Sequence, residues 1–225
     1  MSPNRSRPTR TSSRRRLPDT ARLVRAVAGL GAVLAVALVT VAPTSADSSA
    51  KPRVTVVGDS ITASFDYVPG AKRYLGQGLD LHSDAVVCRR LVAASCAFRG
   101  STPATALELI GAQGRSLGSV VVVNVGYNDW AAVYDVDRVM RALRAAGVTT
   151  AIWVTLGETT ANYAQNNARI RAAARRFGNR LVVADWNAYS RGKPWFREDG
   201  VHLTGSGAMG LARLLRPLVV AGSRS

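Results

Sequence analysis

Three residue types in this sequence could together perform nucleophilic catalysis: a serine, a histidine and an aspartate. Ser60 follows a short apolar run, and His202 stands three residues after Asp199, across a glycine. A seryl hydroxyl becomes a nucleophile only when a base takes its proton, and imidazole is the side chain that changes charge near neutral pH. The spacing lets the carboxylate of Asp199 fold back to the imidazole and fix its tautomer. These residues therefore predict a nucleophilic serine site.

Two further polar residues bear on this site. Asn128, in the segment Gly126-Tyr127-Asn128-Asp129, offers an amide that could hold a developing oxyanion. The second histidine, His82, has only Asp80 and Asp84 nearby and no strand end before it, so we interpret it as a surface or structural residue. Two histidines are too few to indicate a metal site, and we predict neither metal nor cofactor.

The elements that must position these residues are β-branched runs alternating with helical stretches. Strands are expected at Arg53–Val57, Val120–Val125, Thr150–Thr155 and Leu181–Ala184, with a weaker candidate at Ala85–Val87. Helices are expected at Thr105–Gly111, Val136–Ala146, Ala161–Phe177 and Ala208–Val219. Such alternation predicts an α/β fold whose mostly parallel sheet is covered on both faces. Open sheets of this kind carry their chemistry at the carboxyl ends of the strands.

The amino end has the pattern of an export signal. Residues 1–25 are rich in Arg, Ser and Pro, and Ala26–Ala42 is an apolar run of 17 residues without a charge. A basic segment, an apolar segment and small residues after it are typical of a secretory signal. An uncleaved single anchor is the alternative, although a span needs about 20 apolar residues. We expect a signal peptide and disordered basic N-terminus over 1–50, one domain over 51–225, and a secreted or cell-envelope location.

Charge and cysteine content bear on partners and on the compartment. The chain has 30 Lys+Arg against 14 Asp+Glu, a net charge of +16, but the arginines are scattered and no nucleic-acid-binding motif accompanies them. We therefore expect a solubility charge and no nucleic-acid partner. The two cysteines, Cys88 and Cys96, lie close together in a chain expected outside the cytoplasm, which favours an intramolecular disulfide over two buried thiols.

Three segments of the chain resemble, in order, conserved blocks of the SGNH/GDSL hydrolases. Val56–Ser60, Gly126–Asp129 and Asp199–Thr204 are similar to blocks I, III and V, and the resemblance covers about residues 53–219. It implies a three-layer α/β/α sandwich with a flavodoxin-like sheet. It also implies a single-domain serine hydrolase that acts on ester bonds.

The family resemblance implies a role for each residue of the set. Ser60 would attack an acyl carbonyl, His202 would be the base, and Asp199 would orient the imidazole. The oxyanion would be held by the backbone N–H of Ser60, by the side chain of Asn128 and by an N–H from block II. Tyr127 and Trp195 could wall an acyl or sugar pocket, although aromatic residues beside catalytic loops also fill core space.

Block II matches the family pattern poorly. The expected strand Ala85–Val87 runs into Cys88-Arg89-Arg90, with no glycine before Gly100. Gly100 and Arg89 are therefore the two candidates for the missing oxyanion donor. The stretch Asp84–Arg90 is also similar to block II in SGNH domains of glycan O-acyltransferases, which favours sugar-borne esters and a position for Arg89 near the site.

Together with the export signal, the resemblance predicts a secreted esterase. It would hydrolyse an acyl or acetyl ester, on a glycan or lipid, through an acyl-Ser60 intermediate. A glycan O-acyltransferase with the same triad is one alternative, and a catalytically silent cell-wall glycan-binding domain is another. We favour water as the acceptor because the acyltransferases similar to this sequence draw on a multi-span membrane domain, whereas this sequence has one apolar run of such length. We expect a monomer, attached to a membrane by a single N-terminal anchor at most.

Overall fold

The structure, a computed structural model, describes residues 50–224 of the chain. The predicted signal peptide lies outside these residues. Across the described range, none of the helices has both the length and the apolar character needed to cross a bilayer.

A five-stranded, all-parallel sheet forms the centre of the described domain. Its strands are β1 (Arg53–Gly58), β2 (Asp80–Ala85), β3 (Val120–Asn124), β4 (Thr150–Val154) and β5 (Leu181–Ala184). They lie in the order β2-β1-β3-β4-β5, the flavodoxin-like order. After β1 the chain adds β2 on one side, and it then crosses to add β3 on the other. The crevice at this reversal is the usual ligand position in open α/β sheets.

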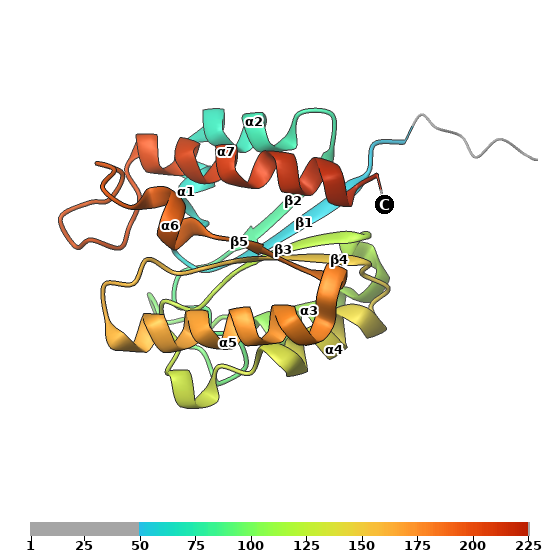
Figure 1. Cartoon of the computed structure of the whole chain (residues 1–225), viewed down its shortest axis with the longest axis horizontal. Coiled ribbons are helices and arrows are strands. Elements are labelled where there is room, and N and C mark those ends of the chain that lie inside the picture. The colour runs from blue at the N-terminus through green and yellow to red at the C-terminus, as the bar shows by residue number, and fades with distance from the viewer. Residues whose placement is uncertain (1–49, 225) are drawn as a thin grey trace, which may run out of the picture. The chain divides into compact units, whose positions relative to one another are not determined.

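Helices cover both faces of the sheet, which confirms the predicted three-layer sandwich. The helices are α1 (Ser64–Tyr67), α2 (Pro69–Gly76), α3 (Ala106–Gln113), α4 (Val136–Ala145), α5 (Ala161–Phe177), α6 (Trp186–Ser190) and α7 (Gly205–Gly222). In Figure 1, α1, α2, α6 and α7 lie on one face of the sheet and α3, α4 and α5 on the other. Each face has its own buried apolar cluster, because the inner strands are β-branched on both sides.

The sheet also corrects one sequence-based expectation. The strand predicted at Ala85–Val87 was wrong, since β2 spans Asp80–Ala85 and ends where that strand was to begin. Strand β2 is the edge strand next to β1, and four of the six residues in its sequence DLHSDA are polar, as suits a strand in which no residue is fully buried. It therefore lacks the apolar run that revealed the inner strands. This shift moves the turn after β2 to Val86 and the residues that follow it.

Candidate active site

Ser60 lies in the tight turn that joins β1 to α1. The carbonyl of Asp59 accepts the N–H of Ala63 at 3.1 Å, and its carboxylate accepts the N–H of Ile61 at 3.0 Å. A Cβ at Gly58 would collide with the side chain of Thr62, so the turn can fold back on the strand only with glycine at this position. The turn holds Ser60 half-exposed at the carboxyl end of β1.

The carboxylate of Asp59 also connects this turn to the loop after β3. Its second oxygen accepts the backbone N–H groups of Gly126 at 3.1 Å and Tyr127 at 3.3 Å. Asp59 is fully buried, and this burial raises its pKa to about 6 although the hydrogen bonds oppose the shift. The two segments predicted to carry the serine and the asparagine are thus fixed to each other.

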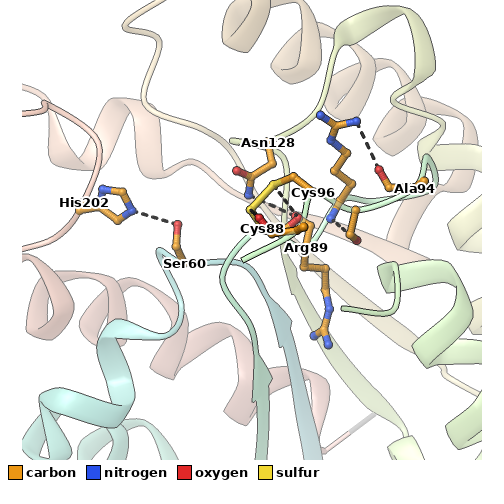
Figure 2. The surroundings of a disulfide bond; sticks show 10 residues. Ser60, Cys88, Arg89, Ala94, Cys96, Asn128 and His202 are labelled. Carbon is orange, nitrogen blue, oxygen red and sulfur yellow. Dashed lines mark hydrogen bonds between the residues drawn. A yellow bond between two sulfur atoms is a disulfide. The ribbon is translucent and has the colours of Figure 1, made fainter. Parts of the chain in front are cut away.

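The three residues predicted for nucleophilic catalysis form one chain of hydrogen bonds. Nε2 of His202 lies 3.0 Å from Oγ of Ser60, and Nδ1 of His202 lies 2.7 Å from Oδ2 of Asp199. Figure 2 shows the imidazole pointing toward the serine. With its proton on Nδ1, the ring donates to Asp199 and leaves Nε2 to accept the proton of Ser60, which is the geometry of a serine hydrolase triad.

The Asp199 carboxylate is fixed by its own loop. Its Oδ1 accepts the backbone N–H groups of Val201 at 2.9 Å and His202 at 2.8 Å. These hydrogen bonds, together with that to the imidazole, lower the pKa of Asp199 to about 2 although the side chain is exposed. The carboxylate therefore stays ionised, and able to orient the imidazole, at any pH where a neutral histidine exists.

This loop is fastened to the start of α7. The carbonyl of Trp195 accepts both the N–H of Thr204 at 2.9 Å and its hydroxyl at 3.1 Å, and the Thr204 side chain caps α7. A Cβ at Gly207 would collide with the same carbonyl, so the first turn of α7 packs directly on the loop. The N–H of Arg197 adds a bond of 2.7 Å to the carbonyl of His202. The base is thus positioned by a compact, locally bonded hairpin.

Asn128 lies on the opposite side of the serine from this hairpin. Its Nδ2 donates to the carbonyl of Arg89 at 3.2 Å, as Figure 2 shows. The neighbouring Asp129 is buried and accepts the N–H of Leu91 with both carboxylate oxygens, at 3.0 and 3.1 Å. Burial, with a smaller contribution from the nearby Asp59, raises the pKa of Asp129 to about 7. The Asn128 amide has a second hydrogen left over for an oxyanion.

The structure does not support either predicted block II donor. The N–H of Arg89 already donates to the carbonyl of Val86 at 3.2 Å, and its guanidinium is buried against Asp84, 2.9 Å from that carboxylate. Gly100 lies in an exposed turn closed by hydrogen bonds between Phe98 and Ser101. In the described part of the chain, no hydrogen bond links Gly100 to the triad or to Asn128.

Cys88 occupies the place where sequence reasoning looked for a glycine. It follows the true end of β2 by three residues, has a φ of +72°, and forms a disulfide with Cys96. That φ is one that glycine adopts freely and other residues rarely do. This position could not be recognised from the sequence for two reasons. The strand was predicted too far along the chain, and the residue at the turn is not glycine. The predicted disulfide itself is present.

The two aromatic residues predicted at the substrate pocket have structural partners. The Tyr127 hydroxyl accepts the N–H of Gly157 at 2.7 Å, and its ring meets Tyr163 edge-on at 5.1 Å. The Trp195 ring stacks on Trp186 at 5.7 Å and packs against α7. These contacts account for both side chains without a substrate. His82 lies exposed on β2, in register with Thr55, as its interpretation as a surface residue predicts.

A groove opens beside the loop that carries Asp199 and His202. It has a volume of about 480 Å³, and it is lined in part by Glu158, Asn187, Arg191, Lys193 and Phe196. Most of these side chains are polar, so the groove suits a hydrated, hydroxyl-bearing group better than a long acyl chain.

Comparison with known proteins agrees with this geometry. The model of the GDSL-like Lipase/Acylhydrolase family matches residues 56–209, a range that contains Ser60, Asn128, Asp199 and His202. No curated protein sequence matches the chain significantly.

Several solved structures share the fold at low sequence identity. A carbohydrate acetylesterase family member from Sinorhizobium meliloti is 19% identical, with a TM-score of 0.58 over 77% of this chain and 100% of its own. The psychrotrophic esterase EstA from Pseudoalteromonas sp., in a structure inhibited by monoethylphosphonate, is 12% identical, with a TM-score of 0.55 over 78% and 100%. A family 3 carbohydrate esterase from Clostridium thermocellum is 16% identical, with a TM-score of 0.52 over 77% and 97%.

Proposed function

Since this chain belongs to the GDSL-like lipase/acylhydrolase family, we propose that it is an exported serine esterase that works through an acyl-Ser60 intermediate. One observation carries the proposal: the unbroken hydrogen-bonded chain from Asp199 through His202 to Ser60, with links of 2.7 and 3.0 Å. A binding domain without catalysis would have no need to keep all three groups in this alignment.

Acylation begins when the Oγ of Ser60 attacks the ester carbonyl carbon and its proton passes to Nε2 of His202. The carbonyl oxygen becomes an oxyanion, for which the Asn128 amide and the Ser60 N–H are donors. In the described residues this N–H has no acceptor of its own. The tetrahedral intermediate collapses, the bond to the alcohol oxygen breaks, and the imidazolium gives its proton to the leaving alcohol. Asp199 stabilises the imidazolium while it exists.

Deacylation repeats the sequence with water as the nucleophile. His202 takes a proton from the water as its oxygen attacks the acyl carbon, and the second tetrahedral intermediate expels the Ser60 oxygen. The proton on His202 returns to that oxygen, which releases a carboxylic acid and restores the hydroxyl. A sugar hydroxyl in place of water would give acyl transfer, so the acceptor alone separates an esterase from the transferase alternative.

For the substrate we propose a short acyl ester, such as an acetyl ester, on a glycan. The groove beside the loop that carries His202, with charged and amide side chains in its lining, supports a hydroxyl-rich alcohol portion. The likeness of residues Asp84–Arg90 to block II of glycan O-acyltransferases points the same way. Two of the structurally similar proteins are described as carbohydrate esterases, which fits this class although it shows only the fold.

The test is product partitioning with purified wild type and Ser60→Ala. Each protein receives an aryl ester series of increasing acyl length, first alone and then with a glycan oligomer at millimolar concentration. We expect wild type to be fastest with acetate and to release free acetate even when the glycan is present, while Ser60→Ala is inactive. Predominant formation of acetylated glycan would replace the esterase with the transferase. Absence of hydrolysis with every ester would overturn the proposed function.

Export is supported by the basic and apolar segments at the amino end and by the disulfide. The test is mass spectrometry of the amino terminus of protein recovered from the culture medium and from the cells. We expect the medium to contain a chain that begins close to residue 50. Full-length protein found only inside the cells would contradict export.

A further inference from the structure

Cys88 has a backbone conformation that its residue type disfavours. Among residues 50–224, Cys88 and Arg99 are the two non-glycine residues with positive φ, at +72° and +52°. A β-carbon makes the left-handed region unfavourable, so such a residue persists only when its surroundings hold it there. Residues held in this way cluster at functional sites.

The backbone around Cys88 is anchored next to the serine turn. Two residues before it, the N–H of Val86 donates to the carbonyl of Gly58 at 3.2 Å. One residue after it, the carbonyl of Arg89 accepts the Asn128 amide at 3.2 Å. Cys88 therefore lies between the segment that carries Ser60 and the side chain of Asn128, and Figure 2 shows these residues together.

The N–H of Cys88 has no hydrogen-bond acceptor within the part of the chain that the structure describes. The N–H groups on its C-terminal side are occupied, since Arg89 donates to Val86 and Arg90 donates to the Ser95 hydroxyl at 3.2 Å. A backbone donor left open beside an asparagine amide and a nucleophilic serine is a candidate for binding negative charge.

The family resemblance implies an oxyanion donor from block II, beside the Ser60 N–H and the Asn128 amide. We propose that Cys88 supplies this N–H here, and that the disulfide to Cys96 keeps Cys88 in the left-handed conformation that presents it. This inference rests on the proposed esterase function. Cys88 is the donor, and Cys96 is a positioning residue that acts through the disulfide and through its own N–H, which donates to the Cys88 carbonyl at 3.3 Å.

The remaining contacts separate this role from general stabilisation. Arg89 is held by Asp84 and by the carbonyl of Ala104, at 2.9 and 3.0 Å, and Leu91 is held by Asp129. On the N-terminal side of the turn, the Val86 N–H stays bonded to the carbonyl of Gly58, so both sides of the turn remain attached when the disulfide is opened. Opening the disulfide therefore releases mainly the backbone of Cys88. Its φ can change to a negative value, which turns its N–H away from the position of the oxyanion. Loss of the disulfide should therefore lower kcat without unfolding the domain.

The experiment compares two variants that both lack the disulfide, Cys88→Gly/Cys96→Ser and Cys88→Ala/Cys96→Ser. Glycine adopts the left-handed conformation without steric cost, whereas alanine does not. We expect the glycine variant to have the higher kcat of the two. The alanine variant should lose about tenfold in kcat with little change in KM. Each kcat is expressed per Ser60 titrated with a fluorophosphonate, so that a smaller folded fraction does not count as slower chemistry.

Wild type treated with dithiothreitol supplies the second arm. The reductant gives two electrons and two protons to the Cys88–Cys96 bond, which yields two thiols and a cyclic disulfide of the reagent. We expect the kcat of wild type to fall to near the alanine variant's value. Dithiothreitol should not change the kcat of the glycine variant, which has no disulfide. Equal kcat in the two variants, whether high or low, would overturn the inference. If oxidised wild type itself hydrolyses no aryl ester, the failure belongs to the proposed function and removes this inference with it.

Discussion

The two sides of Ser60 are built in different ways. On one side, Asp199 and His202 belong to a single short loop, the hydrogen bonds of Asp199 run to residues at most three positions away, and both side chains are exposed. On the other side, Asn128 and Cys88 lie on separate loops joined by contacts between residues nearly 40 apart in sequence, such as Leu91 with Asp129. The proton-relay side thus depends on side chains in a local motif, whereas the oxyanion side depends on the backbone and on long-range contacts.

The two sides of Ser60 therefore tolerate different changes. On the relay side, we expect a conservative substitution to remove a chemical group while the local hydrogen bonds of the loop persist. On the oxyanion side, a donor can be lost without changing any residue that bears it, if the loops move apart.

The largest effect is expected on the relay side. Ser60→Ala and His202→Ala should each lower kcat by about 10⁴–10⁶, because the nucleophile and its base act as one unit. Steady-state kinetics with an aryl acetate measure the effect, and circular dichroism checks the fold. His82→Ala is the matched control and should be fully active. If His82→Ala were inactive and His202→Ala active, the assignment of His202 as the base would be wrong.

Asp199→Asn should cost less than either, on the order of 10³–10⁴ in kcat. The amide can still accept the backbone N–H groups of Val201 and His202, but it cannot stabilise an imidazolium or reliably select the tautomer with Nε2 free. Kinetics across a pH range are the measurement. A loss as complete as that of His202→Ala would mean that Asp199 does more than orient the ring.

On the oxyanion side, Asn128→Ala should lower kcat by about 10²–10³ with little change in KM, because its amide meets charge that exists mainly in the transition state. Asn162 offers a matched amide, since it bonds the carbonyl of Asp129 at 2.7 Å and the N–H of Ala131 at 2.8 Å. Asn162→Ala should lower stability and leave kcat per titrated site nearly intact. An Asn128→Ala effect confined to KM would recast Asn128 as a substrate-binding residue.

The smallest effect concerns stability and pH. The pKa of buried Asp129 is raised from 3.8 to about 7, so the folded state holds this proton more tightly than the unfolded state does. The contribution of Asp129 to the free energy of unfolding is therefore greatest at low pH, and it declines as pH rises from about 4 through about 7. Asp129→Asn keeps an acceptor for Leu91 without the charge, so its stability relative to wild type should rise over that window by roughly 2–4 kcal/mol.

Urea unfolding at pH 5 and pH 8 measures this difference. Asp199→Asn is the control from the other side of the site. The pKa of Asp199 is lowered to about 2, so its stabilising contribution is complete above about pH 4 and is lost only below it. Its stability difference from wild type should be the same at both pH values. A pH-independent difference for Asp129→Asn would contradict the buried, proton-holding carboxylate.

The same contrast explains what the sequence could predict. The inner strands and the long helices could be predicted because β-branched runs and glycine residues at helix ends are local features of the sequence. Helix α5, for example, spans the predicted Ala161–Phe177. Ser60, Asn128, Asp199 and His202 could be proposed from the sequence because the proposed chemistry belongs to side chains. Each of them also lies close to a partner in sequence or follows a predicted strand. The family resemblance then joined the segments in the right order.

What could not be predicted lies at the exposed edge of the sheet. Strand β2 has no apolar run because it covers no core on its outer side, so its end was assigned too late in the sequence. With the strand predicted to end at Val87, the first glycine after it is Gly100, and Cys88 does not stand out as a donor. Residue type gives no sign of a backbone N–H left open, and the φ of Cys88 depends on partners far along the chain. Trp195 was likewise ambiguous, because its stacking on Trp186 is a tertiary contact.

The most direct test of the whole account is covalent labelling of Ser60. Purified protein is treated with a fluorophosphonate, and the adduct is counted by intact mass and located by peptide mapping. The account predicts one adduct per chain, on Ser60, with loss of esterase activity in proportion to labelling, no adduct on Ser60→Ala and greatly slowed labelling of His202→Ala. Ester hydrolysis that persists in fully labelled protein, or an adduct on a different residue, would contradict it.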